Sequence, residues 1–248
     1  MSGHSKWATI KHKKAATDAR RGKLFSKILK EITVAARLGG GDPKGNPRLR
    51  TAVLEARSNS VPMDNIDRAI KKGTGELEGE TYDEVIYEGY APGGVAVLVE
   101  AATDNRNRTT AEVRHLFTRH GGSLAEAGSV AWMFKRRGSF TLERSALPGG
   151  MTEEQLMELA LELGVDDISI EDDRYEMYTA VEDFASVQEE LEARNIPAAN
   201  ELAMVPQTTI DVPSDRINQL LRLLEALDDH DDVQKVWANA NIDESVLA

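Results

Sequence analysis

The chain of 248 residues contains no cysteine. That absence excludes a disulfide framework, a cysteine-ligated zinc site and a thiol nucleophile, and it fits a reducing compartment, so we expect a cytoplasmic protein. Long apolar runs are missing too, since none approaches the ~18 residues that a membrane-spanning helix needs. The N-terminal segment lacks the apolar stretch of a secretory signal. The sequence therefore predicts no membrane partner.

Motifs of enzyme active sites are also lacking. There is no nucleophile elbow, no HExxH pair and no glycine-rich phosphate loop. His4 and His12 have no cysteine near them, and His115 and His120 are five apart, which does not place them on one helix face. The acidic run 228–232 lacks the spacing of a calcium loop and is interpreted as a solvated turn. We expect no catalysis, no cofactor, no metal and no small-molecule substrate. An enzyme acting in a cleft between domains stays an alternative, and it would need paired carboxylates or histidines with shifted pKa values.

What the chain does have is a very uneven distribution of charge. Residues 1–73 hold 17 Lys and Arg against 6 Asp and Glu, a net charge of +11, whereas residues 74–248 hold 13 against 36, a net charge of −23. A basic end on an acidic chain is typical of a segment that meets a polyanion. Nucleic acid is the expected partner, because its phosphates attract Lys and Arg regardless of sequence.

We interpret residues 1–23 as a basic arm, followed by a helix that begins at Leu24. An aromatic side chain among lysines, Trp7, can stack on an exposed base or pack against the protein. The alternative for such a tail is a solvated terminus without a ligand. The predicted phosphate contacts of the arm are Lys6, Lys11, Lys13, Lys14, Arg20, Arg21 and Lys23, with Trp7 beside them.

Helical periodicity dominates the rest of the first 80 residues. Apolar residues recur at helical spacing from Leu24 until Gly39. Asn46 and Pro47 are typical of a helix start, and a third helix is expected from Pro62 to Gly73. These patterns predict an all-helical N-terminal domain over residues 1–80.

Strands alternate with helices after residue 80. Residues 135–206 contain the order β-α-β-β-α-β of a ferredoxin-like split βαβ unit. The flanking segments, in which 129–134 is expected as a strand, can join into a second sheet with two helices. The sequence thus predicts an α+β multidomain protein, with the helical domain followed by two ferredoxin-like α/β domains, one inserted in the other. The expected boundaries are 1–80, 81–134 plus 207–248, and 135–206.

A polar loop precedes the first helix of the α/β part. Residues 109–112 resemble a capping box, which would start that helix at Thr109. Arg106 and Arg108 lie just before it. They either belong to a helix-capping loop or form a second anion contact beside the helix dipole.

Several short motifs are spread over the whole chain: 1–7 (MSGHSKW), 10–14 (IKHKK), 18–23 (DARRGK), 46–50 (NPRLR), 62–66 (PMDNI), 86–94 (IYEGYAPGG), 104–109 (DNRNRT) and 128–134 (GSVAWMF). Through these motifs the sequence resembles the YebC/PmpR family. The resemblance implies a helical domain, two α/β domains and the family's usual label, a probable transcriptional regulator that binds DNA. It also implies an alternative role in translation, since related mitochondrial activators of cytochrome oxidase act on translation and some members are linked to ribosomes stalled on proline-rich stretches.

The charge pattern cannot separate DNA from ribosomal RNA, because both present the same phosphates. Sequence-specific control of DNA needs side chains aimed at base edges, and the connection 39–45 is long for a helix-turn-helix. Physical reasoning favours structured RNA slightly, whereas the family's label favours DNA. A structural scaffold is a further alternative, and it predicts that replacing the arm lysines with alanine leaves activity intact.

Overall fold

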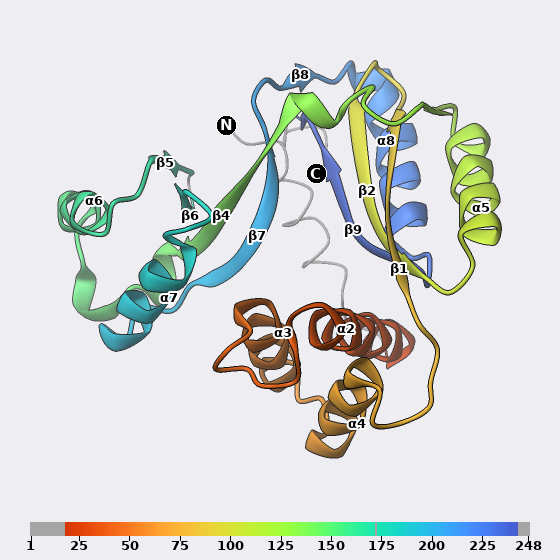
Figure 1. Ribbon diagram of the computed structural model, residues 1–248. Coiled ribbons are helices and arrows are strands. Elements are labelled where there is room, and N and C mark those ends of the chain that lie inside the picture. Colours follow the sequence, from red (N-terminus) through yellow and green to blue (C-terminus); the bar gives the residue numbers. More distant parts are fainter. Residues whose placement is uncertain (1–17, 172, 243–248) are drawn as a thin grey trace. The chain divides into compact units, whose positions relative to one another are not determined.

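The computed structural model describes residues 18–171 and 173–242 and divides them into two compact units (Figure 1). Met133–Thr208 form one unit, and the described residues up to Trp132 together with those from Thr209 form the other. The chain therefore leaves one unit, builds the second, and returns. The predicted α+β class, with a helical N-terminal domain followed by α/β domains, is confirmed.

Three helices build the N-terminal domain. They are α2 (Asp18–Gly39), α3 (Pro47–Ser58) and α4 (Met63–Thr74). Their apolar faces share one core, in which Ile32, Leu49 and Ile66 are almost fully buried. Each such side chain contributes about 1.5–3 kcal/mol through burial, so this core holds the three helices together.

The helix starts show where local signals were sufficient. Asn46 caps α3 as predicted, because its Oδ1 accepts from the N–H of Leu49 at 3.1 Å. Its amide also donates to the carbonyl of Ala35 at 2.8 Å, which ties α3 to α2. The predicted start of α2 at Leu24 was wrong, since the helix begins at Asp18. The sequence of residues 18–23 has no apolar periodicity, but it contains Ala, Arg and Lys, which are good helix formers.

A four-stranded antiparallel sheet follows in the same unit, in the order β3-β1-β2-β9. Helices α5 (Arg106–Arg119) and α8 (Ser214–Asp228) cover one of its faces (Figure 1). Phe117 and Leu220 belong to the core between helices and sheet. The strands are β1 (Asp83–Tyr90), β2 (Ala96–Thr103), β3 (Ser123–Leu124) and β9 (Val233–Ala238), and a short parallel pair joins β8 (Ile210–Asp211) to β10 (Ala240–Asn241).

Two local predictions in this domain were wrong. Helix α5 starts at Arg106 rather than Thr109, because Asn105 is the cap and its side chain accepts from the N–H of Arg108. The expected strand at 129–134 is a bend followed by the 3-10 helix η1 (Ala131–Met133). The carboxylate of Glu88 accepts three backbone N–H groups of this segment, so they are not available to a strand ladder.

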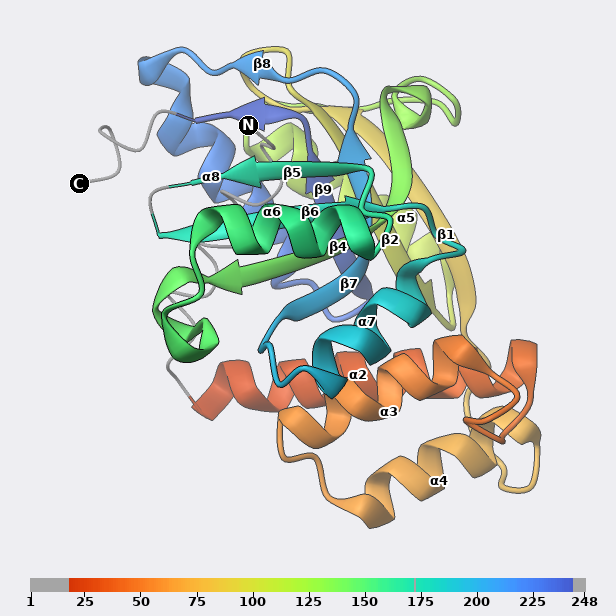
Figure 2. The ribbon, with the colours of Figure 1, turned by 90° about the vertical axis from the view of Figure 1, so that its left-hand side faces the viewer.

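The unit Met133–Thr208 has the predicted order β-α-β-β-α-β, and its antiparallel sheet runs β5-β6-β4-β7, the strand order of a ferredoxin-like fold. Two helices lie on one face of the sheet (Figure 2), where Phe140, Met177 and Leu191 form the core. Short 3-10 turns η2 (Arg144–Ala146) and η3 (Pro148–Gly150) link the first strand to the first helix. The elements are β4 (Phe134–Glu143), α6 (Glu153–Glu162), β5 (Asp167–Ile170), β6 (Arg174–Thr179), α7 (Phe184–Ala193) and β7 (Ala199–Pro206).

Candidate nucleic-acid interface

Helix α2 carries three lysines on one face, which we call the lysine row: Lys23, Lys27 and Lys30. Their spacing of four and three residues places them above one another on the helix. The row contacts the segment Asp228–Asp232 between α8 and β9, here called the acidic turn. Lys23 Nζ donates to the carbonyl of Asp229 at 2.9 Å, Lys30 Nζ donates to that of Asp231 at 3.1 Å, and Lys27 Nζ donates to that of Asp228. Carbonyls at a helix C-terminus carry partial negative charge, so they suit ammonium groups.

Asp232 is the centre of this contact. Its carboxylate accepts from Lys30 Nζ at 2.7 Å on one oxygen and from Arg108 Nη2 and Thr109 Oγ1, each at 2.7 Å, on the other. Only 6% of the side chain is exposed. Burial by itself would raise the pKa of Asp232, but the hydrogen bonds from Lys30, Arg108 and Thr109 outweigh it and hold the pKa well below its usual range. The buried carboxylate is therefore ionised and neutralised by two cations.

The interpretation of residues 228–232 as a solvated turn was wrong. The turn receives the lysine row from α2, about 200 residues earlier in the chain, and buries Asp232. Spacing rules describe neighbours along a helix or strand, so they gave no sign of this pairing. The one available signal was complementary charge, with a basic run early in the chain and an acidic run late.

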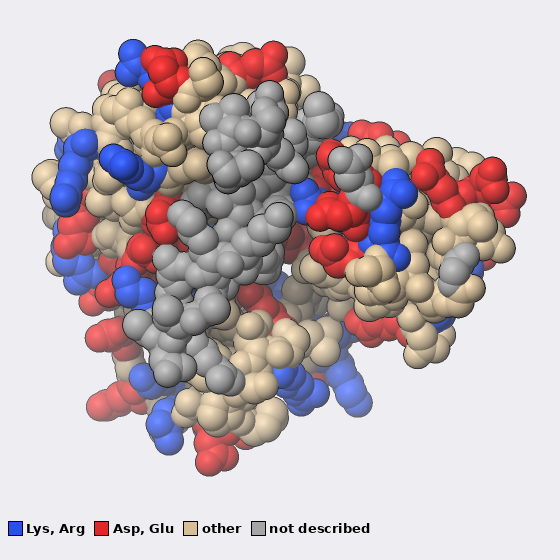
Figure 3. Space-filling view, turned by 180° about the vertical axis from the view of Figure 1, so that it is seen from behind, with Lys and Arg blue, Asp and Glu red and all other residues tan. Residues whose placement is uncertain are grey.

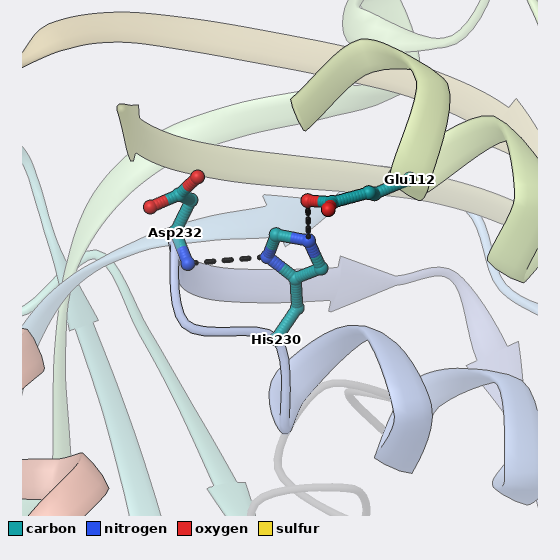
Figure 4. Close-up of side chains that lie close together, drawn as sticks. All are labelled: Glu112, His230 and Asp232. Atoms are coloured by element: carbon teal, nitrogen blue, oxygen red, sulfur yellow. Dashed lines mark hydrogen bonds and ion pairs between the residues drawn. The ribbon is translucent and has the colours of Figure 1, made fainter. Parts of the chain in front are cut away.

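Glu112, His230 and Asp232 lie close together beside this network (Figure 4), and their possible ligand atoms fall within 4.8 Å of one another. The N–H of Asp232 donates to His230 Nδ1 at 3.1 Å, so the ring proton of the neutral imidazole is on Nε2, which lies 3.0 Å from Glu112 Oε2. Both ring nitrogens are thus occupied, and the Asp232 carboxylate is already paired with Lys30 and Arg108. These three residues are therefore better explained as hydrogen-bond partners that stabilise the acidic turn than as a metal site.

Two further contacts join the helical domain to the sheet domain. Arg48 of α3 lies 2.7 Å from Glu31 Oε1 and 2.6 Å from Glu84 Oε1, so its planar guanidinium bridges α2 and β1. Lys30 Nζ lies 5.2 Å from the ring centroid of Tyr82, within the range of a cation–π interaction. Together with the acidic turn, these contacts hold α2 against the sheet domain.

The predicted phosphate-binding residues fall into four groups. Arg20 and Arg21 lie near the start of α2. Lys23 belongs to the lysine row, and Arg108 is paired with Asp104 at 2.8 Å as well as with Asp232. Arg106 begins α5, is exposed, and has no acidic partner in the described part of the chain. The remaining predicted residues, Lys6, Trp7, Lys11, Lys13 and Lys14, lie outside the described residues.

Sequence reasoning missed a second set of basic residues in the helical domain. These side chains have no acidic partner within residues 18–171 and 173–242, and most are exposed. On the face seen in Figure 3, Lys and Arg of this domain stand among Asp and Glu. The net charge of residues 1–73 was the signal that could have identified them. They are Arg37, Lys44, Arg50, Arg57, Arg68, Lys71 and Lys72.

The architecture defines a multidomain α+β protein with a basic helical domain, a sheet domain and a ferredoxin-like insert. Residues 5–76 match the TACO1/YebC protein N-terminal domain, and residues 82–240 match the TACO1/YebC second and third domain. The chain belongs to the TACO1/YebC family. None of the described helices is long and apolar enough to cross a bilayer.

Full-length relatives support the same assignment. The chain is 54% identical over 250 residues to "Probable transcriptional regulatory protein CT1665" of Chlorobaculum tepidum, covering 100% of this chain and 98% of that protein. It is 54% identical over 247 residues to a "Probable transcriptional regulatory protein" of Desulfosudis oleivorans, covering 99% of each. The crystal structure of conserved hypothetical protein Aq1575 from Aquifex aeolicus superposes with a TM-score of 0.84 at 48% identity, covering 93% of this chain and 94% of that one. The family is thus one whose relatives are named as transcriptional regulators.

Proposed function

We propose that this protein is a nucleic-acid-binding regulator, a DNA-binding transcriptional regulator that contacts phosphates through its basic N-terminal arm. The observation that carries the proposal is the concentration of 17 Lys and Arg against 6 acids in residues 1–73 of a chain whose formal net charge is −12. The relatives named as transcriptional regulatory proteins support it.

The contacts of the lysine row narrow the set of side chains that are proposed to bind phosphate. Because Lys27 and Lys30 are engaged by the acidic turn, they contribute little free positive charge. Contact with phosphate then rests on the residues that precede the row, with Lys23 at its edge and Trp7 stacking on a base. The exposed cations of α3 and α4 extend the same basic surface. The proposed phosphate contacts of the arm are Lys6, Lys11, Lys13, Lys14, Arg20, Arg21 and Lys23.

The acidic domains give the complex an orientation. Residues 140–248 hold 6 Lys and Arg against 26 Asp and Glu, so phosphates repel most of this part. The molecule docks with its helical domain, residues 1–80, toward the nucleic acid. The α/β domains, 81–134 with 207–248 and 135–206, remain available to protein partners.

A ribosomal role is a second candidate: an rRNA-binding translation factor that relieves stalling on proline-rich stretches. This candidate is supported by helix α4, whose first turns are unsuited to sequence-specific reading of DNA. Only four residues separate α3 from α4, a length seen in helix-turn-helix motifs. However, the first turns of α4 present Asp64 and Asp67, and a recognition helix reads bases with its N-terminal residues. Carboxylates there oppose entry into a groove lined by phosphates.

Full-chain variants test the arm. Replacing Lys6, Lys11, Lys13 and Lys14 with alanine is expected to weaken binding to a fluorescein-labelled DNA duplex at least tenfold at low salt. Each lost contact with duplex DNA lowers the slope of log K against log salt by about 0.9. The control is Arg144→Ala with Arg194→Ala, which removes two exposed cations of the insert that are already paired with Glu153 and Glu162. Equal binding by wild type and the arm variant would refute the proposal.

Crosslinking in cells separates DNA from RNA. Protein crosslinked to its bound nucleic acid is recovered and the attached sequences are determined, with the arm variant as background. Enrichment of promoter DNA supports the transcriptional role. Enrichment of ribosomal RNA without promoter DNA would replace it with the translational one.

A further inference from the structure

The helical face of the sheet domain carries a second group of basic side chains, which we call the α5–α8 patch: His115, Arg119, His120 and Arg222. Residues 114–122 contain two arginines and two histidines without any acid, and residues 216–224 contain two arginines without any acid. Figure 3 shows Lys and Arg at the surface over α5 and α8, on the left. Neither the arm nor the acidic turn includes these residues.

Backbone geometry brings the two halves of the patch together. Helix α5 ends at Arg119, and Gly121 turns the chain with φ +76°, in the left-handed region that favours glycine. A Cβ placed on Gly122 would lie 3.3 Å from Leu223 Cδ2, and one on Gly121 would overlap the Gln219 side chain. The end of α5 therefore rests on the turn of α8 that carries Arg222.

The charges of the patch are not compensated. Arg119 and Arg222 are exposed, and neither has an ion-pair partner among the described residues. The pKa of His120 is held below its usual value by partial burial and then by the nearby Arg119 and Arg222 guanidinium groups, with His115 beside them. Like charges held together oppose folding, and a bound anion would remove that repulsion.

The sheet domain is acidic overall, so carboxylates that could have paired with the patch are plentiful. Residues 81–132 and 209–242 contain 14 Asp and Glu against 7 Lys and Arg. Two other arginines there are paired: Arg108 with Asp104 and Asp232, and Arg216 with Asp215 at 3.4 Å. Among the described residues Arg106 is unpaired as well, but it stands alone at the start of α5, whereas the patch brings unpaired arginines from two helices together.

We propose that the α5–α8 patch is a second phosphate-binding surface for the nucleic acid held by the arm, with Arg119 and Arg222 contacting backbone phosphates. This inference rests on the proposed function. Arginine suits the role because its planar fork matches phosphate oxygens with two parallel hydrogen bonds. Exposed side chains on two helices fit an extended ligand that already binds elsewhere on the molecule.

The test is the double charge reversal Arg119→Glu with Arg222→Glu in the full chain, compared with Arg119→Lys with Arg222→Lys. Binding to a fluorescein-labelled 30-bp DNA duplex, and to an RNA duplex of the same sequence, is followed by anisotropy across a salt series. The Glu variant is expected to bind at least tenfold more weakly at low salt. On DNA its slope should be shallower by about 1.8, since each contact contributes about 0.9. The Lys variant should keep the slope.

A matched control carries the same change in charge on the insert, Arg144→Glu with Arg194→Glu, and should bind like wild type. Unchanged affinity and salt slope in the Arg119→Glu with Arg222→Glu variant would overturn the proposal that the patch binds phosphate. If the arm lysine variant still loses affinity for DNA, the proposed function is retained. A control that loses as much as the patch variant would also overturn the patch. Failure of the wild type to bind either duplex would overturn both proposals.

Discussion

Lys30 of α2 and Asp232 of the acidic turn meet at 2.7 Å although 202 residues separate them in sequence. The lysine side chain is 17% exposed and the carboxylate 6%. This ion pair, with Arg108 on the second carboxylate oxygen, is the most buried of the contacts given above that fix the helical domain to the sheet domain. Much of what can be tested about the architecture follows from it.

Replacing Asp232 with Asn removes the negative charge and leaves Lys30 partly buried without a counter-charge. Breaking one side of a buried ion pair costs about 3 kcal/mol, and the free energy of unfolding should fall by roughly that amount. Urea denaturation measures it. The control Asp231→Asn, at a carboxylate that is 81% exposed, should change the free energy by less than about 0.5 kcal/mol. Equal stability of the two variants would contradict this role of Asp232.

The same carboxylate makes stability depend on pH. The folded-state pKa of Asp232 lies below the value of about 3.9 expected in the unfolded chain. Its contribution is therefore fully present well above pH 4 and is lost as the pH falls through the unfolded and then the folded pKa. Unfolding measured between pH 7 and pH 2 should show the gap between wild type and Asp232→Asn narrowing below about pH 4. A gap that stays constant over this range would rule out the ionised pair.

Glu88 holds the loop that leads into the insert. Its carboxylate accepts from the N–H groups of Gly128, Val130 and Ala131 at 2.7–2.8 Å. Burial by itself would raise the pKa of Glu88, but these hydrogen bonds outweigh it and keep the pKa below its usual value. Glu88→Ala leaves these donors without a partner, which should cost about 3 kcal/mol. Denaturation measures the cost, and hydrogen exchange should rise in residues 128–131. Glu126→Ala, at an exposed carboxylate of the same loop, is the control and should alter neither.

The lysine row predicts how the helical domain opens. Lys27→Ala with Lys30→Ala removes hydrogen bonds to the acidic turn while leaving the core of α2, α3 and α4 intact. Limited proteolysis should then cut faster in the connection 75–82, and high salt should produce the same effect in wild type because it screens the charges. Lys71→Ala with Lys72→Ala, at exposed lysines of α4, is the matched control. Equal rates of proteolysis at 75–82 in the two variants would contradict the conclusion that the lysine row holds the helical domain against the sheet domain.

Local signals predicted most elements of the fold. Asn46 followed by proline identified the start of α3, and the pattern β-α-β-β-α-β identified the insert, because capping and periodicity depend on residues close together in sequence. The errors occurred where a distant residue changed a local preference. Thr109 resembled a helix cap, but its hydroxyl is bound to Asp232 and Asn105 takes the cap instead.

The site was harder to predict for the same reason. Charge counting identified the basic end of the chain, yet it assigned Lys23 to phosphate binding and interpreted the acidic run as a solvated turn, without relating the two. The pairing between α2 and the acidic turn depends on the tertiary fold, which brings together segments about 200 residues apart. Spacing rules along one helix or strand do not describe such contacts. The α5–α8 patch escaped because His115 and His120 were judged only by their positions on one helix, whereas Arg222 comes from another.

The ferredoxin-like unit begins and ends at neighbouring points. Gln207 donates its N–H to the carbonyl of Met133 at 2.8 Å, and Phe134 pairs with Pro206 at the first step of the ladder between β4 and β7. The first and last residues of the insert therefore lie next to each other. A short glycine-rich linker from Trp132 to Thr209 is expected to replace the 76 residues of the insert without straining the other unit. The course of the chain therefore favours deletion or exchange of the insert as a single segment.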